Sequence, residues 1–355
     1  MNLRGVLVFE DVRRDGCRHR PEHVHAVEHI ANRPIAHHVL DTLRGAGVEE
    51  ILVVSSAEVA ATIEDCLSGW ADTASPPIRH IVEDGRVDLP SALSLAAPHV
   101  GDSPCIVHTA GGLLGEALAP VVAQLRDGAP DVTVFVYQGA AGDGHLSPAT
   151  QEMLHLAEMD PEHAALGLAG VWLFGPGGIG RVAASSWQAS DEVDLTSVAA
   201  AVGAGAGRFK VLSAETWASY SGDALDLLDL NRLALDTLHA DTRRPYNHGN
   251  RIEGRVWIHE QALVRSSVIV GPTVIGPGAR VTEAYVGPYT SVGAGAQIEG
   301  AEIERSIISS GASILHVGGR IVSSVVGRDA RVFRDFSLPR AMRLRVGDGT
   351  EVALS

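Results

Sequence analysis

The chain has 355 residues, which is long for one compact domain, and it has no apolar run of about 18 residues that would predict a membrane-spanning helix. Its formal net charge of −15 argues against general binding to nucleic acid. Cys17, Cys66 and Cys105 are odd in number and widely spaced, which predicts reduced thiols in a cytoplasmic protein. Lys210 is the one lysine among 28 basic residues, so a mechanism that needs two lysines is excluded.

The first part of the chain alternates apolar, strand-like runs with helix-like segments. We expect strands over 3–9, 50–55, 78–83, 105–108, 132–137 and 169–174, and helices over 35–46, 59–67, 90–97 and 225–238. Such alternation predicts a doubly wound α/β domain with a mostly parallel sheet. A polar linker at 243–250 follows, so we expect domains at 1–242 and 243–355.

The second domain has a different pattern, with small residues between apolar residues that recur near every sixth position. The apolar positions are Ile258, Val264, Val270, Ile275, Val281, Val286, Val292 and Ile298. This period predicts a parallel β-helix, in which each hexapeptide forms one side of a triangular coil. An antiparallel sheet with Gly-rich turns would not keep period six over about twelve repeats. Because a β-helix has exposed ends and flat faces, we expect capping or self-association.

Several phrases in this order resemble one enzyme family. They are Ala31-Asn32-Arg33-Pro34-Ile35, Gly170-Val171-Trp172-Leu173-Phe174, Leu227-Leu228-Asp229-Leu230-Asn231-Arg232, Val286-Gly287-Pro288-Tyr289-Thr290 and Leu344-Arg345-Val346-Gly347-Asp348. Their order and spacing resemble the long-form glucose-1-phosphate thymidylyltransferases, which are sugar-1-phosphate nucleotidylyltransferases. The resemblance covers essentially the whole chain. It implies a Rossmann-like nucleotidyltransferase domain followed by a left-handed β-helix.

The family's chemistry depends on neutralising and aligning phosphates while a sugar 1-phosphate attacks a nucleoside triphosphate. The resemblance places the family's Gly-rich loop on 10–15, which contains no glycine. Glu10 and Asp11 stand where backbone N–H groups of glycines would close around the triphosphate. Like charges at contact distance cost on the order of several kcal/mol, so this loop should not accept a nucleotide in the family's way.

The other family positions are replaced as well. The lysine of the family's P-K pair maps to His25, and the two metal aspartates map to Gly111 and Ser197. The E-K-P phrase maps to Glu158-Met159-Asp160, and a late aspartate becomes Tyr220. Mg²⁺ requires hard oxygen ligands, so the absence of both aspartates predicts no metal anchor and no cofactor, in contrast to the family pattern.

The N-terminal histidines allow two interpretations. His19, His23 and His25 have a spacing that suits zinc, but they are also compatible with solvated replacements in a loop that has lost its original task. His37 and His38 fall inside the predicted helix on different faces, which favours packing or surface roles.

The predicted remnant of the cleft is acidic, which suits a cation or a neutral polyol. Its expected lining comprises Glu10, Asp11, Glu83, Asp88, Glu158 and Asp194, together with His25, His108 and Tyr220. One hypothesis is a non-catalytic homologue that is a partner or regulator in a sugar-nucleotide or specialised-metabolite pathway. The alternative is a repurposed enzyme that acts on a small metabolite through His25, His108 and Tyr220. Residual nucleotidyl transfer is the least favoured hypothesis, and we expect a homo-oligomer.

Overall fold

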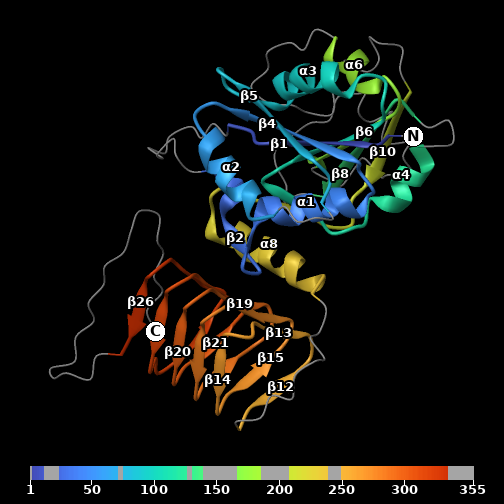
Figure 1. Ribbon diagram of the computed structural model, residues 1–355. Coiled ribbons are helices and arrows are strands. Elements are labelled where there is room, and N and C mark those ends of the chain that lie inside the picture. The colour runs from blue at the N-terminus through green and yellow to red at the C-terminus, as the bar shows by residue number, and fades with distance from the viewer. Residues whose placement is uncertain are drawn as a thin grey trace. The chain divides into compact units, whose positions relative to one another are not determined.

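The computed structural model describes residues 2–11, 24–70, 75–125, 130–138, 166–184, 208–238 and 249–334. The chain forms two compact units, Met1–Thr237 and Leu238–Ser355 (Figure 1). The expected boundary at 242/243 lies outside the described residues. Among the described helices, none combines the length and the apolar character needed to cross a membrane.

The first unit is built on a seven-stranded sheet with the order β10-β8-β9-β6-β1-β4-β5. The strands are β1 (Arg4–Val8), β4 (Glu50–Ser56), β5 (Ile78–Glu83), β6 (Cys105–Thr109), β8 (Val132–Gln138), β9 (Leu166–Phe174) and β10 (Phe209–Ser213). Strand β9 is antiparallel to both of its neighbours, and the other pairs are parallel. The carboxyl ends of β1, β4 and β5 therefore lie along one edge of the sheet.

Helices cover both faces of this sheet, with α3 and α6 on one face and α1 and α2 on the other (Figure 1). The helices are α1 (Ile35–Gly45), α2 (Ala60–Ser68), α3 (Leu89–Val100), α4 (Ala119–Leu125), α6 (Gly178–Ala183) and α8 (Ala224–Asp236), with a 3₁₀ turn η1 (His25–Val27). Two small pairs complete the unit: β2 (His29–Ile30) with β3 (Arg33–Pro34), and β7 (Gly112–Leu114) with β11 (Trp217–Ser219). This is the α/β architecture that the sequence predicts.

Polar side chains fix where the helices begin. Asp88 caps α3 in a reciprocal capping box, because its carboxylate accepts from the Ser91 N–H at 2.9 Å and its own N–H donates to the Ser91 hydroxyl at 2.9 Å. Asp223 caps α8 by accepting from the Leu225 N–H at 2.9 Å. Both helices therefore start where a carboxylate satisfies the first free amides.

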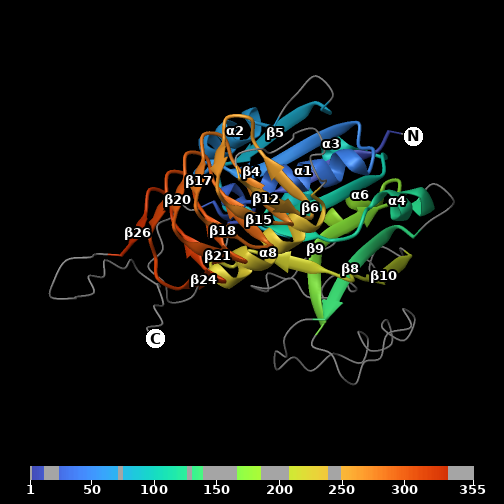
Figure 2. The same ribbon diagram turned by 90° about the horizontal axis from the view of Figure 1, so that it is seen from below.

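The second unit is the predicted left-handed β-helix, with three five-stranded parallel sheets (Figures 1 and 2). The first sheet contains β12 (Arg251–Glu253), β15 (Val268–Val270), β18 (Tyr285–Val286), β21 (Glu302–Glu304) and β24 (Arg320–Val322). The second contains β13 (Val256–Ile258), β16 (Thr273–Ile275), β19 (Thr290–Val292), β22 (Ile307–Ile308) and β25 (Val325–Val326). The third contains β14 (Leu263–Arg265), β17 (Arg280–Thr282), β20 (Gln297–Glu299), β23 (Ser313–Leu315) and β26 (Arg331–Phe333).

Each coil buries one column of aliphatic side chains per sheet. Val264 pairs with Val281 and Val281 with Ile298, so one coil is 17 residues long. The predicted apolar position Val270 was wrong, because Ile269 is fully buried there and Val270 is only partly buried. The step from Val264 to Ile269 is five residues, which shortens that corner by one residue.

The corners of the coils place non-glycine residues in the left-handed region. Ser266, Glu283 and Ser323 each have φ of 49°. The serine that follows two of these residues donates its hydroxyl to the carbonyl two positions back, at 2.7 Å for Ser267 and 2.9 Å for Ser324. A serine hydroxyl therefore adds a hydrogen bond to a carbonyl group at the start of each of these two turns.

Candidate functional site

The expected acidic residues lie at the edge of the sheet where β1, β4 and β5 end. Glu10 and Asp11 follow β1, Glu83 ends β5, and Asp88 caps α3. The parallel order β1-β4-β5 brings these loops together, although they are far apart in the chain. Glu158, Asp194 and Ser197 lie outside the described residues. We refer to the exposed acidic residues at this edge, Glu10, Glu58, Asp84 and Asp88, as the acidic edge.

Asp11 is held by the loop between β5 and α3. Its carboxylate accepts from the Ser56 hydroxyl at 2.9 Å and from the Val87 N–H at 2.8 Å. Its own N–H donates to the Val87 carbonyl at 2.9 Å, and the Arg86 guanidinium donates to the Asp11 carbonyl at 2.6 and 3.0 Å. The backbone amide and the carboxylate of Asp11 are therefore committed to neighbouring groups of the chain.

Glu10 lies beside the first turn of α3. Desolvation together with the charge of Asp88 raises the pKa of Glu10 to about 7. The Leu89 amide and the charge of Arg86 oppose this shift. The side chain keeps exposed surface, while protein atoms crowd its carboxylate. A carboxyl group of the chain thus lies beside the start of α3.

Three of the replaced family positions meet at the β7–β11 pair. The Tyr220 N–H donates to the Gly111 carbonyl at 2.9 Å, which extends that pair by one residue. His25 Nδ1 lies 3.2 Å from the Tyr220 carbonyl oxygen, and the two rings are 4.8 Å apart between centroids. A Cβ added at Gly111 meets no atom within 4 Å, so the space for a side chain remains open at this position.

His108 lies apart from this group and is buried in the core of the first unit. Its Nδ1 donates to the Thr109 carbonyl at 2.7 Å, and its ring lies 5.8 Å from the Trp217 ring. Burial lowers the pKa of His108 to about 4, and its Nε2 has no hydrogen-bond partner in the structure. A neutral buried ring of this kind is a packing residue rather than an exposed acid–base group.

The remaining histidines do not form a metal cluster within the described ranges. His37 Nε2 donates to the Cys66 carbonyl at 2.8 Å, and His38 Nε2 donates to the Ile30 carbonyl at 3.1 Å. Desolvation lowers the pKa of both rings, to about 4 for His38. His19 and His23, on which the zinc hypothesis depends, lie outside the described residues.

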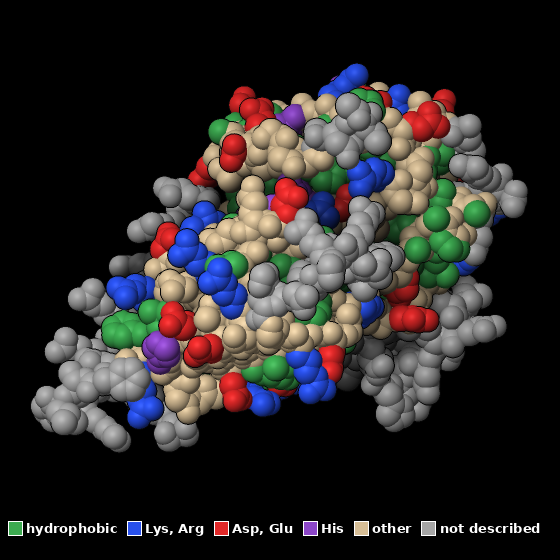
Figure 3. Space-filling view, turned by 60° about the horizontal axis from the view of Figure 1, so that its bottom comes forward, with side chains coloured by type: hydrophobic (Ala, Val, Ile, Leu, Met, Phe, Trp, Pro, Cys, Tyr) green, Lys and Arg blue, Asp and Glu red, His purple; other side chains and the backbone are tan. Residues whose placement is uncertain are grey.

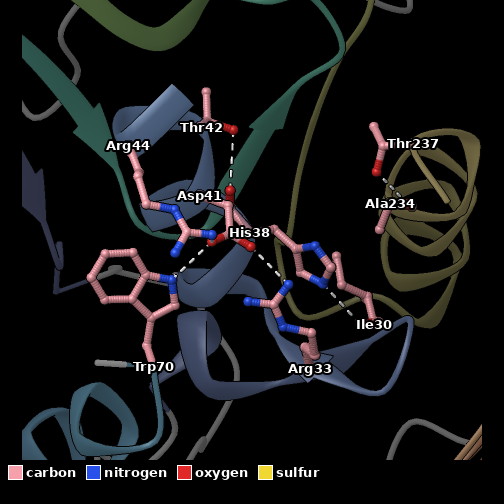
Figure 4. A network of polar contacts seen from close by, with 9 residues as sticks. All are labelled: Ile30, Arg33, His38, Asp41, Thr42, Arg44, Trp70, Ala234 and Thr237. Carbon is pink, nitrogen blue, oxygen red and sulfur yellow. Dashed lines mark hydrogen bonds and ion pairs between the residues drawn. The ribbon is translucent and has the colours of Figure 1, made fainter. Parts of the chain in front are cut away.

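The carboxylate of Asp41 in α1, a residue that no sequence pattern indicated, contacts side chains from three segments of the first unit (Figure 4). Asp41 accepts from Arg33 at 2.7 Å, from Arg44 at 2.8 Å and from the Trp70 indole N–H at 3.0 Å. The Arg44 guanidinium also lies 5.5 Å from the centre of the Trp70 ring. One side chain therefore joins β3, α1 and the segment after α2.

The family asparagine in α8 has a structural role that the sequence alone did not show. Asn231 is buried, and its Oδ1 accepts from the Ala31 N–H at 2.8 Å. Ala31 and Asn32 both have positive φ, at 46° and 64°, in the turn between β2 and β3. Asn231 therefore supports a tight turn that lies 200 residues earlier in the chain.

The described residues do not fit the magnesium ion that the family implies. The resemblance expects a metal aspartate at Gly111, which has no side-chain oxygen, and a further aspartate at Tyr220, which has no carboxylate. The acidic side chains nearby are engaged elsewhere, since Asp11 binds Ser56 and Asp88 caps α3. Mg²⁺ needs several hard oxygen ligands in near-octahedral geometry, which these side chains do not supply.

Comparisons with known proteins identify the family. No family model matches the chain. It is 30% identical over 335 residues to a glucose-1-phosphate thymidylyltransferase of Streptomyces griseus and 27% identical to one of Streptomyces antibioticus, covering 92% of each chain. It is 26% identical to the low-salt glycan biosynthesis nucleotidyltransferase Agl11 of Haloferax volcanii, with 92% coverage.

A solved structure supports the same fold. It is a protein from Bacillus anthracis assigned as a glucose-1-phosphate thymidylyltransferase, in complex with sucrose; it matches with a TM-score of 0.52 and 13% identity, over 67% of this chain and 98% of that one. At this identity the likeness concerns the fold alone. Together with the sequence relatives, which span almost the whole chain, it shows that the chain belongs to the sugar-1-phosphate nucleotidyltransferase family.

Proposed function

We propose that this chain is a non-catalytic member of its family, a partner or regulator in a sugar-nucleotide or specialised-metabolite pathway. The proposal rests on the hydrogen bonds that already occupy the loop after β1. Asp11 is bound through its amide, carbonyl and carboxylate, and the carboxyl group of Glu10 lies beside the first turn of α3. A phosphate-binding loop needs free amide donors, and like charges would oppose a triphosphate at this place.

A second observation supports the same proposal. Gly111, His25 and Tyr220 lie together, so the positions that the resemblance assigns to charged groups still converge in the fold. None of the three supplies a carboxylate or a permanent cation there. The scaffold has thus been kept while the groups that neutralise phosphate have been exchanged.

The test is a direct comparison with an active thymidylyltransferase. Purified protein is incubated with dTTP, glucose 1-phosphate and Mg²⁺, and pyrophosphate release is followed beside calorimetric titration with dTTP. We expect neither pyrophosphate nor binding heat from this chain, while the active enzyme gives both. Turnover above the rate of a blank without protein would end the proposal.

A repurposed enzyme is the second candidate, and the contact between His25 and Tyr220 favours it. An imidazole and a phenol 4.8 Å apart between ring centres are groups able to bind or move a proton on a small metabolite. A thermal-shift screen of sugars, sugar phosphates and amino sugars tests this, because a ligand of the native state raises its stability. A genuine ligand should lose its effect in both His25→Ala and Tyr220→Phe, and retention in both would reject this candidate.

A further inference from the structure

The last coil of the β-helix leaves its end uncovered in the described part of the chain. Strands β24, β25 and β26 are the outermost strands of the three sheets, so each presents an unpaired edge. Inward-facing Ile298 and Ile314 are fully buried, whereas Val332, in the same column, is 36% exposed. Unpaired strand edges and exposed core residues are features that soluble proteins cover.

The side chains at this end have the character of a protein interface. Val322, Val332 and Phe333 are exposed, and the Arg331 guanidinium lies 5.4 Å from the centre of the Phe333 ring. Arg328 and Arg331 are exposed as well. Aromatic and arginine side chains are enriched at interface cores and hot spots. We refer to Arg328, Arg331, Val332 and Phe333, which lie in β26 and the turn before it, as the terminal coil surface.

Charge limits which partner fits this surface. Arg320 is already paired with Glu302 at 3.1 Å and Glu304 at 3.2 Å, and Asp329 is the one acidic residue in 317–334. Two such ends placed face to face would bring arginines against arginines, which disfavours a symmetric contact between them. The partner should therefore be acidic.

The first unit supplies an acidic surface of this kind. It carries 32 acidic and 14 basic residues, a net charge of −18, whereas the second unit carries 11 acidic and 14 basic residues, a net charge of +3. At the acidic edge, Glu10, Glu58, Asp84 and Asp88 are all exposed, and they follow three neighbouring strands. Charged side chains of both signs are visible on the molecular face in Figure 3.

We propose that the terminal coil surface of one copy docks on the acidic edge of a second copy. Such a contact joins two different surfaces, so it is heterologous and leads to a closed ring or a chain of copies. It would cover the open end of the β-helix and place exposed arginines against carboxylates. The proposal does not depend on whether the chain transfers nucleotide.

The experiment measures the mass of the full chain in solution by size-exclusion chromatography with light scattering. Because exposed charges are screened by salt, we expect a mass above one chain at about 50 mM NaCl that falls towards one chain at about 500 mM. Arg328→Glu with Arg331→Glu should weaken association by about tenfold or more, and so should Glu58→Arg with Asp84→Arg. Arg265→Glu with Arg280→Glu, in earlier coils, is the matched control and should leave the mass unchanged.

A mixture of the two reversed variants is the decisive arm. In the mixture, the glutamates on the terminal coil surface of one variant can face the arginines at the acidic edge of the other, and the two unchanged surfaces complement each other as in the wild type. The two variants should therefore associate again at low salt, to a mass comparable with that of the wild type. Circular dichroism establishes that each variant is folded. A single-chain mass at low salt, or an oligomer that persists unchanged in both reversed variants, would overturn the proposal.

Discussion

The β-helix repeats one packing requirement in every coil, whereas the first unit combines a packed core with loops that carry polar contacts. In the β-helix, every coil repeats the same requirement for buried aliphatic residues, as at Val281, Ile298 and Ile314, so its sequence pattern remains regular. In the first unit the sheet has a packed core as well, and the loops at the strand ends make polar contacts with one another, as those of Asp11 with Ser56 and Val87 show. Packing constrains residues throughout both units, whereas catalysis constrains a few loop positions that can be lost without loss of the fold.

The largest expected effect tests the role of packing in the β-helix. Ile298→Ala removes a fully buried side chain in a middle coil, and we expect a loss of about 2–5 kcal/mol in the free energy of unfolding. Val332→Ala is the matched change in the same column at the exposed end, and we expect it to cost under about 1 kcal/mol. Urea unfolding followed by circular dichroism measures both, and equal losses would contradict the stacked-column description.

The next effect is a loss of stability at low pH that arises in the first unit. Burial lowers the pKa of His108 to about 4, so between about pH 6.5 and 4 the unfolded chain binds a proton that the folded chain does not. Stability is therefore present above the unfolded pKa and is lost as the pH falls through this window, by on the order of 3 kcal/mol. Thermal unfolding from pH 7 to 4 should show a smaller loss in His108→Phe, and identical slopes for the two proteins would reject this account.

A smaller effect tests the Asp41 cluster on the first unit. Asp41→Ala removes the acceptor of the Trp70 indole N–H, and Trp70 is itself buried, so we expect a loss of about 1–3 kcal/mol. Asp65→Ala, at an exposed position of α2, is the control and should change the free energy of unfolding by about 0.5 kcal/mol or less. Chemical denaturation measures both variants, and a loss at Asp65 as large as that at Asp41 would remove the special role of the cluster.

The smallest effect has the opposite sign to that of His108. The folded chain holds the Glu10 proton more tightly than the unfolded chain, so this group destabilises the protein increasingly as the pH rises from about 4.5 through 7. Glu10→Gln keeps the shape without the charge, and we expect a slightly higher melting temperature than wild type at pH 8 and no gain at pH 4. A lower melting temperature at pH 8 would show that the ionised carboxylate stabilises the first turn of α3.

The sequence predicted the elements well because both patterns are governed by burial. Strands such as Ile78–Glu83 were located to the residue, and others, such as Arg4–Val8, to within one residue. The single aliphatic misplacement, Val270 for Ile269, arose because a corner of the coil is one residue short. The same five-residue step recurs from Val281 to Val286 and from Ile298 to Ile303, so a coil of 17 residues has an average period slightly below six.

The site was harder to predict because its contacts join distant segments. Placing Glu10 and Asp88 at one edge follows from the order of parallel strands, but no sequence pattern shows that Asp11 binds Ser56 and Val87. The structure buries His108 in the core. Its apolar neighbours in the strand were the sequence signal for a core position. Asp41 lies within the predicted helix 35–46, and no sequence pattern indicates that Arg33, Arg44 and Trp70 donate to it.

The bond between Asn231 and Ala31 has a consequence for the order of events during synthesis. The turn between β2 and β3 gains its buried acceptor only after Asn231 has left the ribosome, and β7 gains β11 at nearly the same time. The β2–β3 turn therefore completes its contacts only when a late helix has been made, whereas each coil of the β-helix pairs with the coil made just before it.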